Sequence, residues 1–263
     1  MSNNWKENTI LYKLFFTEIW HLAFIKSSIL FENFNQNHIK IQLTKKNFFK
    51  DILPPISYSF LADPFGVFIG DYYYLYFEYL NYRKKKGEIH CHKYDKNLDL
   101  VDKNVLIRKD YHLSYPYPFV ENNDIYILPE MVQSNGNQAI FKFHKDSISY
   151  QEKLLNIKAL LDPCLTKYNN HYYILGSING KKHAFMSKKI LGDYKEIKYI
   201  SHHQYNQSGG KIVNYNNNFF RPLQISNITY GEKTLFTKII FQKDKVTEGK
   251  NTFTIESKSH YQQ

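Results

Sequence analysis

Short runs of apolar and aromatic residues alternate with turn residues along the chain, and one such arrangement recurs four times. Each copy holds an apolar strand, a turn rich in Gly, Asn or Asp, and an aromatic strand, as in Asp63-Pro-Phe-Gly-Val-Phe-Ile-Gly-Asp-Tyr-Tyr-Tyr-Leu-Tyr-Phe-Glu78. The copies align without a gap over residues 63–78, 115–130, 162–177 and 209–224. Each copy therefore predicts a β-hairpin.

The spacing of the copies predicts the architecture. A repeat of about 50 residues built from strands is typical of a propeller blade. Further strand-like runs follow the copies at residues 88–94, 139–144, 184–188 and 234–241. We expect an all-β fold, a five-bladed β-propeller that occupies residues 1–263 as a single domain. A β-sandwich is the alternative, but it would not predict this register.

The two ends of the chain are expected to complete the fifth blade. Residues 18–25 and 39–43 are strand-like, and so is the tail at 252–258. Pairing of the N-terminal and C-terminal strands would close the ring and leave no free sheet edge.

Equivalent positions of the repeat should converge around one channel, and several of them carry carboxylates. The leading positions are Asp63, Tyr115, Asp162 and Gly209, and the closing positions are Glu78, Glu130, Ser177 and Gln224. Carboxylates around a narrow channel suit glycosidic chemistry, in which one stays ionised as base or nucleophile and another is held protonated as acid. The catalytic candidates are Asp63, Glu130 and Asp162.

Each of these positions also has a structural interpretation. An Asp before Pro opens turns and accepts backbone hydrogens. Glu130 follows Pro129 in an apolar strand, where a buried carboxylate needs a partner or a raised pKa. Glu78 equally suits a structural ion pair. Arg221 either pairs with a carboxylate or binds a substrate anion, and His112 either reaches the channel or lies in a plain turn. The candidates for substrate binding are Glu78, His112, Tyr115, Arg221 and Gln224.

Composition excludes several classes of protein. The 23 Tyr and 20 Phe exclude a disordered chain, and two Cys exclude a disulfide scaffold. No apolar run is long enough for a transmembrane helix. The apolar stretch at 10–31 is interrupted by charges and has no small-residue cleavage site, so it is not a convincing signal peptide. We therefore expect a cytoplasmic location.

A net charge of +11 raises the question of an anionic partner. The basic residues include only three Arg, whereas base and phosphate recognition favours Arg forks, so we expect no nucleic acid. Weak attraction to anionic lipid or to nucleotide phosphates would give at most peripheral membrane contact. The His90-Cys91-His92 tract has no further ligands nearby, and we expect no metal site and no cofactor, with a divalent cation in the channel left open.

The ordered set of motifs resembles a known family. It comprises Ala62-Asp63-Pro64-Phe65, Phe77-Glu78, Gly87-Glu88-Ile89, His112-Leu-Ser-Tyr-Pro116, Pro129-Glu130, Leu161-Asp162-Pro163 and Arg221-Pro222-Leu-Gln224. The set is similar to the propeller domain at the N-terminus of plant glucosamine inositolphosphorylceramide transferases, and to bacterial relatives associated with surface polysaccharide assembly. The domain is distantly similar to the glycoside hydrolase family 43 superfamily. That resemblance implies Asp63 as base, Glu130 as acid and Asp162 as modulator. Cys164 and Leu223 depart from the family pattern.

The resemblance implies a carbohydrate-active enzyme. The expected function is a glycosyltransferase of bacterial capsule or lipopolysaccharide biosynthesis, acting on a nucleotide sugar or a glycan acceptor. It would work beside polysaccharide-assembly enzymes, in the cytoplasm or peripheral to the inner membrane. A hydrolase of the family 43 type and a non-catalytic glycan-binding or scaffold propeller are the alternatives. Fold alone does not choose among them.

Overall fold

The computed structural model describes residues 23–26, 40–43, 59–81, 84–145, 147–205, 207–226 and 233–256. The chain divides into two compact units. The first unit is Trp20–Ala159, and the second unit is Leu160–Gln263 together with Met1–Ile19. Apart from the short 3-10 helix η4 (Val132–Ser134), the regular elements of the described ranges are strands.

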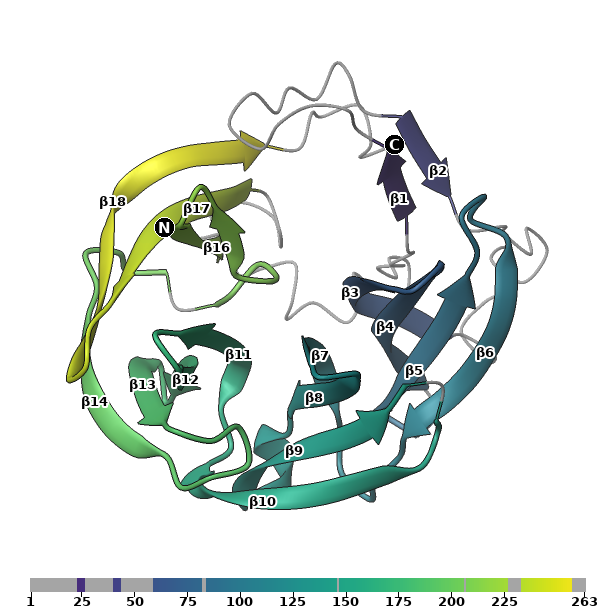
Figure 1. Cartoon of the computed structure of the whole chain (residues 1–263), viewed down its shortest axis with the longest axis horizontal. Coiled ribbons are helices and arrows are strands. Elements are labelled where there is room, and N and C mark those ends of the chain that lie inside the picture. Colours follow the sequence, from purple (N-terminus) through teal and green to yellow (C-terminus); the bar gives the residue numbers. More distant parts are fainter. Residues whose placement is uncertain are drawn as a thin grey trace, which may run out of the picture. The chain divides into compact units, whose positions relative to one another are not determined.

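The first unit contains two four-stranded antiparallel sheets whose strands pair in chain order (Figure 1). One sheet comprises β3 (Ser59–Ile69), β4 (Tyr72–Asn81), β5 (Lys86–Tyr94) and β6 (Leu100–Ile107). The other comprises β7 (Ser114–Glu121), β8 (Asp124–Glu130), β9 (Asn137–His144) and β10 (Tyr150–Lys158). The strands β1 (Ala23–Lys26) and β2 (Lys40–Leu43) pair with each other.

The second unit repeats this arrangement twice and joins the two copies by their outer strands. The third copy forms β11 (Leu161–Tyr168), β12 (His171–Ile178), β13 (Lys181–Ser187) and β14 (Lys195–Ile200). The fourth forms β15 (Val213–Tyr215), β16 (Asn218–Ile225), β17 (Lys233–Phe241) and β18 (Lys245–Glu256). Parallel pairing of β14 with β18 merges them into one eight-stranded sheet.

The four predicted hairpins are confirmed as β3–β4, β7–β8, β11–β12 and β15–β16. Their turns use residues that tolerate the left-handed region. Three of them place a pair of asparagines there, with φ values of 52° and 65° at Asn122 and Asn123. The asparagine pairs at 169–170 and 216–217 have positive φ as well. Such turns match the right-handed twist of the flanking strands, which explains their recurrence.

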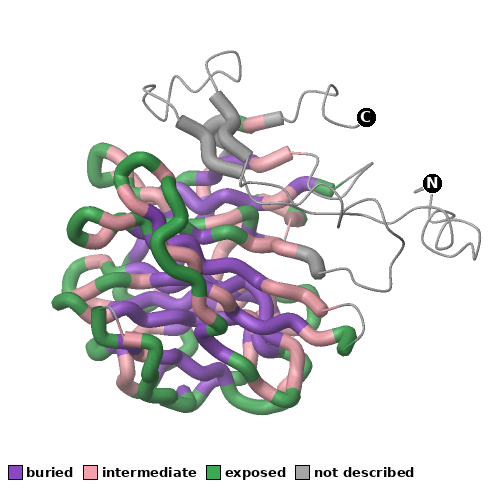
Figure 2. The backbone as a smooth tube through the Cα atoms, turned by 90° about the vertical axis from the view of Figure 1, so that its right-hand side faces the viewer, coloured by how far each residue is buried: buried purple, intermediate pink, exposed green. Residues whose placement is uncertain are grey.

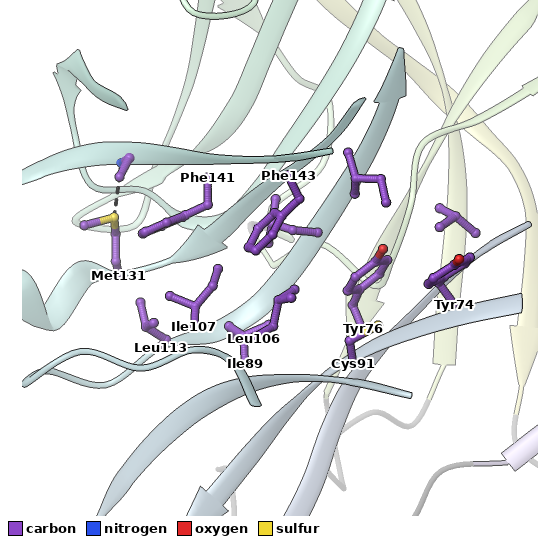
Figure 3. Close-up of a cluster of buried hydrophobic side chains, with 14 residues drawn as sticks. Tyr74, Tyr76, Ile89, Cys91, Leu106, Ile107, Leu113, Met131, Phe141 and Phe143 are labelled. Atoms are coloured by element: carbon purple, nitrogen blue, oxygen red, sulfur yellow. Dashed lines mark hydrogen bonds between the residues drawn. The ribbon is translucent and has the colours of Figure 1, made fainter. Parts of the chain in front are cut away.

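The core of the first unit lies where its two sheets face each other. Alternate residues of a strand point to one face, so Tyr74 and Tyr76 of β4 enter the same cluster as Phe141 and Phe143 of β9 (Figure 3). Met131 closes one side of this cluster, and its Sδ accepts a hydrogen bond of 3.1 Å from the backbone N–H of Ala139. Figure 2 shows buried segments along the strands and exposed ones at the turns.

The all-β class is confirmed, and the strand-like runs that follow each copy lie in β5, β9, β13 and β17. The pattern did not mark β6, β10 and β14, and β18 begins at Lys245 instead of residue 252. Residues 18–22 and 257–258 of the predicted end strands lie outside the described residues. Among the described strands, β1 pairs with β2, and β18 pairs with β17 and β14. Closure of five blades and a single domain over 1–263 stay predictions.

Within the ranges that the structure describes, no helix has the length and apolar character needed to cross a bilayer.

Candidate active site

The leading positions of three repeat copies share one backbone device. Asp63, Tyr115 and Asp162 have φ values of 50°, 47° and 47°. Each lies at a shift in strand register, between Ala62 and Phe65 in the first copy and at the matching places in the next two. A bulge of this kind re-aims the side chain of the extra residue. Positive φ is tolerated by Asp but strained for Tyr, and such strain persists only where the surrounding fold imposes it.

Both leading aspartates bind the backbone at the start of the next copy, Asp63 at its first residue and Asp162 at the residue just before it. Asp63 Oδ2 accepts a hydrogen bond of 3.2 Å from the N–H of Tyr115. Asp162 Oδ2 accepts one of 3.3 Å from the N–H of Ser208. The repeat therefore uses its leading Asp to connect consecutive copies, in the first unit and again in the second. This is the structural interpretation of an Asp before Pro, and it holds at both positions.

Three carboxyl groups of the first unit influence one another electrostatically. Glu78, on β4, pairs with Ala62, and Glu130, on β8, pairs with Ser114, so both occupy the closing position of their hairpin. Burial raises the pKa of Asp63, with the Tyr115 N–H opposing the rise. Burial also raises the pKa of Glu78, and the charges of Asp63 and Glu130 add to it, bringing it to about 8. We call Asp63, Glu78 and Glu130 the carboxyl cluster.

His112 faces the carboxyl cluster from the segment before β7. Its Nε2 lies 3.5 Å from Glu78 Oε1, and its Nδ1 accepts a hydrogen bond of 2.9 Å from the N–H of Gly87. A ring nitrogen that accepts a hydrogen bond carries no proton, so this imidazole is neutral. Burial lowers the pKa of His112, which agrees with the neutral form.

Gly87 is required by the close packing at this point. A Cβ on Gly87 would lie 2.6 Å from Glu78 Oε1 and 2.3 Å from the carbonyl oxygen of Leu113. Real Cβ atoms do not approach backbone oxygen so closely. The sequence motif Gly87-Glu88-Ile89 was noted only for its family resemblance, and the role of its glycine follows from these contacts.

The closing positions of the second unit carry uncharged residues in place of the glutamates of the first unit. The closing position of the third copy is Ser177, which is buried and pairs with Leu161. Gln224 donates from Nε2 to Ser226 Oγ at 3.1 Å and from its backbone N–H to the carbonyl of Gln207 at 3.1 Å. Asp162 belongs to the same unit. Its meeting with the carboxyl cluster in one site stays a prediction.

Arg221 lies in a buried ion pair whose carboxylate the sequence analysis did not propose. Its Nη1 donates to Glu248 Oε1 at 3.2 Å and to the hydroxyl of Tyr199 at 2.8 Å. Glu248 also accepts bonds from Lys182 Nζ at 2.7 Å and Ser201 Oγ at 2.6 Å. Burial alone would raise the pKa of Glu248, but Arg221 and Lys182 lower it to about 2. We call these five residues the buried ion network.

One signal could have found Glu248. It alternates with Val246 along β18, and both side chains are fully buried. A carboxylate in the apolar phase of a strand indicates a buried partner of opposite charge.

Across the described ranges, no group of three or more His, Cys, Asp or Glu side chains is arranged to hold a metal ion, and this includes the tract at His90 and His92.

The sequence has clear relatives among known proteins. A family described as "Glucosamine inositolphosphorylceramide transferase 1, N-terminal" matches residues 53–263. Glucosamine inositolphosphorylceramide transferase 1 of Arabidopsis thaliana is 27% identical over 217 residues, which cover 76% of this chain and 28% of that protein. The protein of that name from Oryza sativa subsp. japonica is 27% identical over 200 residues, covering 69% and 26%. The chain thus spans little more than a quarter of these relatives.

Solved structures of glycoside hydrolases share the fold. An exo-β-1,3-galactanase from Phanerochaete chrysosporium superposes with a TM-score of 0.61 at 11% identity, covering 73% of this chain and 49% of that one. A family 43 β-1,3-galactosidase gives a TM-score of 0.56 at 9% identity, covering 72% and 75%. At these identities the likeness shows an all-β fold like that of the family 43 propeller enzymes.

Proposed function

We propose that this chain, which belongs to the glucosamine inositolphosphorylceramide transferase N-terminal family, is a carbohydrate-active domain whose reaction centre is the carboxyl cluster. The observation that carries the proposal is the raised pKa of Glu78 beside Asp63 and Glu130. Two consecutive repeat copies supply these groups, Asp63 from the leading position of the first copy and Glu78 and Glu130 from the closing positions of both. Carboxyl groups whose environments separate their pKa values are the acid and base of glycosidic chemistry.

We favour glycosyl transfer over hydrolysis because the relatives are named as transferases. In this reaction one carboxylate of the cluster takes the proton of the acceptor hydroxyl, and a protonated carboxyl supports the leaving oxygen. The relatives named here are plant proteins, so they lend no support to a bacterial capsule or lipopolysaccharide setting, which rests on the resemblance in the motifs alone.

A non-catalytic sugar-binding domain is the second candidate. It is favoured by the contacts of Asp63 and Asp162, each of which uses a carboxylate oxygen to bind the backbone of the next copy. A carboxylate held in this way serves the fold whether or not it also serves chemistry.

The test is a product screen by mass spectrometry. The protein is incubated with nucleotide sugars and glycosides as donors and with lipid or oligosaccharide acceptors, beside Asp63→Asn and Glu130→Gln. Asp71→Asn is the matched control, because Asp71 is exposed in the turn after β3 of the same unit. We expect a product of acceptor plus one sugar from the native protein and from the control, and about a 10²-fold or greater loss in the two cluster variants.

Other outcomes of the screen are equally informative. Release of free sugar that depends on the cluster residues would indicate a hydrolase. Saturable glycan binding without a product, unchanged in Asp63→Asn and Glu130→Gln, would overturn the proposed reaction centre and leave the sugar-binding domain.

A further inference from the structure

We propose that Glu78 is the protonated member of the carboxyl cluster, and that His112 and Gly87 are the positioning residues that hold its carboxyl group in the protonated state. The resemblance to family 43 assigned the acid to Glu130, and the repeat pattern made Glu78 a candidate for substrate binding or for a structural ion pair. The use of this proton in a reaction rests on the proposed function. The presence of the proton on Glu78 does not depend on the proposed function.

The surroundings of Glu78 favour its protonated, neutral form over its ionised form. Glu78 pairs with Ala62 on β3 and with Ile89 on β5, and the residue is 5% exposed. The titratable groups that face it among the described residues are Asp63 from β3, Glu130 from β8 and His112 from the segment before β7. The charges of Asp63 and Glu130 both oppose the ionisation of Glu78, because an ionised Glu78 would add a further negative charge to a desolvated site.

His112 cannot supply the missing positive charge. Its Nδ1 is occupied by the N–H of Gly87 at 2.9 Å, and a protonated imidazole would turn two donors toward each other. The neutral ring keeps its hydrogen on Nε2, which faces Glu78 Oε1 at 3.5 Å. One carboxyl oxygen of Glu78 is thereby directed at a donor, and the other is left to carry the proton.

Gly87 fixes this geometry through its backbone. Its N–H binds His112, and its carbonyl oxygen accepts the N–H of Leu113 at 3.1 Å. The two bonds hold the segment before β7 against the start of β5, in a space that any side chain at this position would fill. Gly87 and His112 together therefore set the distance between His112 Nε2 and Glu78 Oε1, and they set the tautomer of the His112 ring.

Glu88 shows that burial alone does not hold a proton. It lies on β5 next to Gly87, and it is 5% exposed, the same as Glu78. Arg108 binds both of its oxygens, from Nε at 2.8 Å and from Nη2 at 2.9 Å. Burial raises the pKa of Glu88, but these bonds outweigh it and lower the pKa overall. Glu88 is thus a matched reference for a buried carboxylate that stays ionised.

The chemistry that follows is proton donation to a leaving oxygen. The O–H bond of Glu78 breaks, and the leaving oxygen takes the proton while it keeps the electron pair of the broken bond to the sugar carbon. The acceptor hydroxyl forms the new bond to that carbon and gives its proton to a carboxylate of the cluster. Such assistance matters most when the leaving group is a poor one, as an alkoxide is, so the site is expected to prefer a glycoside donor to a nucleoside diphosphate sugar.

The presence of the proton is tested on the whole chain by carboxyl ¹³C NMR with labelled glutamate. We expect one glutamate to titrate near pH 8, a signal lost in Glu78→Gln and retained in Glu88→Gln. His112→Asn keeps an acceptor for the Gly87 N–H but removes the donor that faces Glu78. This variant should raise the midpoint of the Glu78 titration by up to about one pH unit, which is the size expected for the loss of a weak hydrogen bond to a charged group. A midpoint in the ordinary range for Glu78 would overturn the proposal.

The use of the proton is tested separately by turnover. If the product screen finds a reaction, Glu78→Gln should lose about 10²–10⁴-fold in rate on a glycoside donor. Full turnover in that variant would overturn the donor role even where the titration is seen. An empty screen with an intact titration would instead contradict the proposed function and leave the proton on Glu78.

Discussion

Glu78 in the first unit and Glu248 in the second are both buried glutamates on strands of the same repeat. We expect Glu78 to be protonated and Glu248 to be ionised at neutral pH. Burial raises the pKa of Glu78 to about 8, with help from Asp63 and Glu130. Burial acts on Glu248 too, but Arg221 and Lys182 bring its pKa to about 2. The partners, and not the depth of burial, decide which carboxyl group is ionised at neutral pH.

This difference separates a structural polar cluster from a candidate functional one. In the buried ion network the cations and hydroxyl donors around Glu248 compensate its charge, and such a network supports one packing of the unit. In the carboxyl cluster like charges are gathered beside a neutral imidazole. That arrangement costs stability, and perturbed carboxyl groups of this kind are concentrated where proteins do chemistry.

The largest effect is expected from removing the charge of Glu248. Glu248→Gln keeps the shape of the side chain but leaves Arg221 and Lys182 without their carboxylate in a buried place. Breaking a buried pair from one side costs about 3–5 kcal/mol. The free energy of unfolding, measured in urea at neutral pH, should fall by that amount.

Glu78→Gln is the matched comparison in the first unit. At neutral pH the native protein must take up a proton at Glu78 on folding, whereas an amide of the same shape needs none, so the urea midpoint of the variant should lie at or above that of the native protein. Equal losses in the two variants would show that Glu78 is compensated in the way Glu248 is, and would remove the contrast between the units.

The second prediction concerns the pH dependence of stability. The pKa of Glu78 is raised in the folded state, so its contribution is fully present below its ordinary value of 4.5 and is lost as the pH rises through about 8. Glu248 has a lowered pKa, so its contribution is present above 4.5 and is lost as the pH falls toward about 2. Urea unfolding across the pH range should therefore show a decline of a few kcal/mol between about pH 4.5 and 8, the alkaline limb of the profile, and a separate decline below pH 4.5, its acid limb.

The variants Glu78→Gln and Glu248→Gln show which residue causes each limb of the stability profile. Glu78→Gln should flatten the alkaline limb and leave the acid limb in place, and Glu248→Gln should do the reverse. An alkaline limb that persists in Glu78→Gln would mean that another group titrates there.

Much of the fold could be predicted from local patterns. The hairpins follow from strands that alternate around asparagine and glycine turns, because both signals lie within a few residues of each other. The outer strands β6, β10 and β14 were missed because they are mostly exposed and carry little apolar pattern. The parallel pairing of β14 with β18 joins Tyr199 to Val246, a separation that no local pattern encodes.

The candidate site was predictable in its members but not in its contacts. Repeat alignment placed Asp63 at a leading position and Glu78 and Glu130 at equivalent closing positions, and the structure brings Asp63 and Glu130 within electrostatic reach of Glu78. The neutral state of His112 depends on a single N–H of Gly87, which lies 25 residues away in the chain. The partner of Arg221 depends on the register of β18, where the predicted strand began too late to include Glu248.

The smallest effects are expected at the leading aspartates, where the two units are alike. Asp63→Ala and Asp162→Ala remove the acceptor of a backbone N–H in the next repeat copy and place Ala at a positive φ. Each should lose about 1–3 kcal/mol in urea unfolding, the cost of a buried unsatisfied donor. The Asn variants keep an acceptor oxygen and suit the left-handed region, so both should unfold close to the native protein at neutral pH.

Alkaline pH should then separate these two Asn variants. Asp63→Asn removes one of the charges that raise the pKa of Glu78, so the titration of Glu78 should move to lower pH and the alkaline loss of stability should shrink. Asp162→Asn should leave that titration in place if its charge acts only within the second unit. A matching shift in both variants would mean that Asp162 shares the electrostatic environment of the carboxyl cluster, and would thereby supply the contact between repeat copies that the sequence predicts.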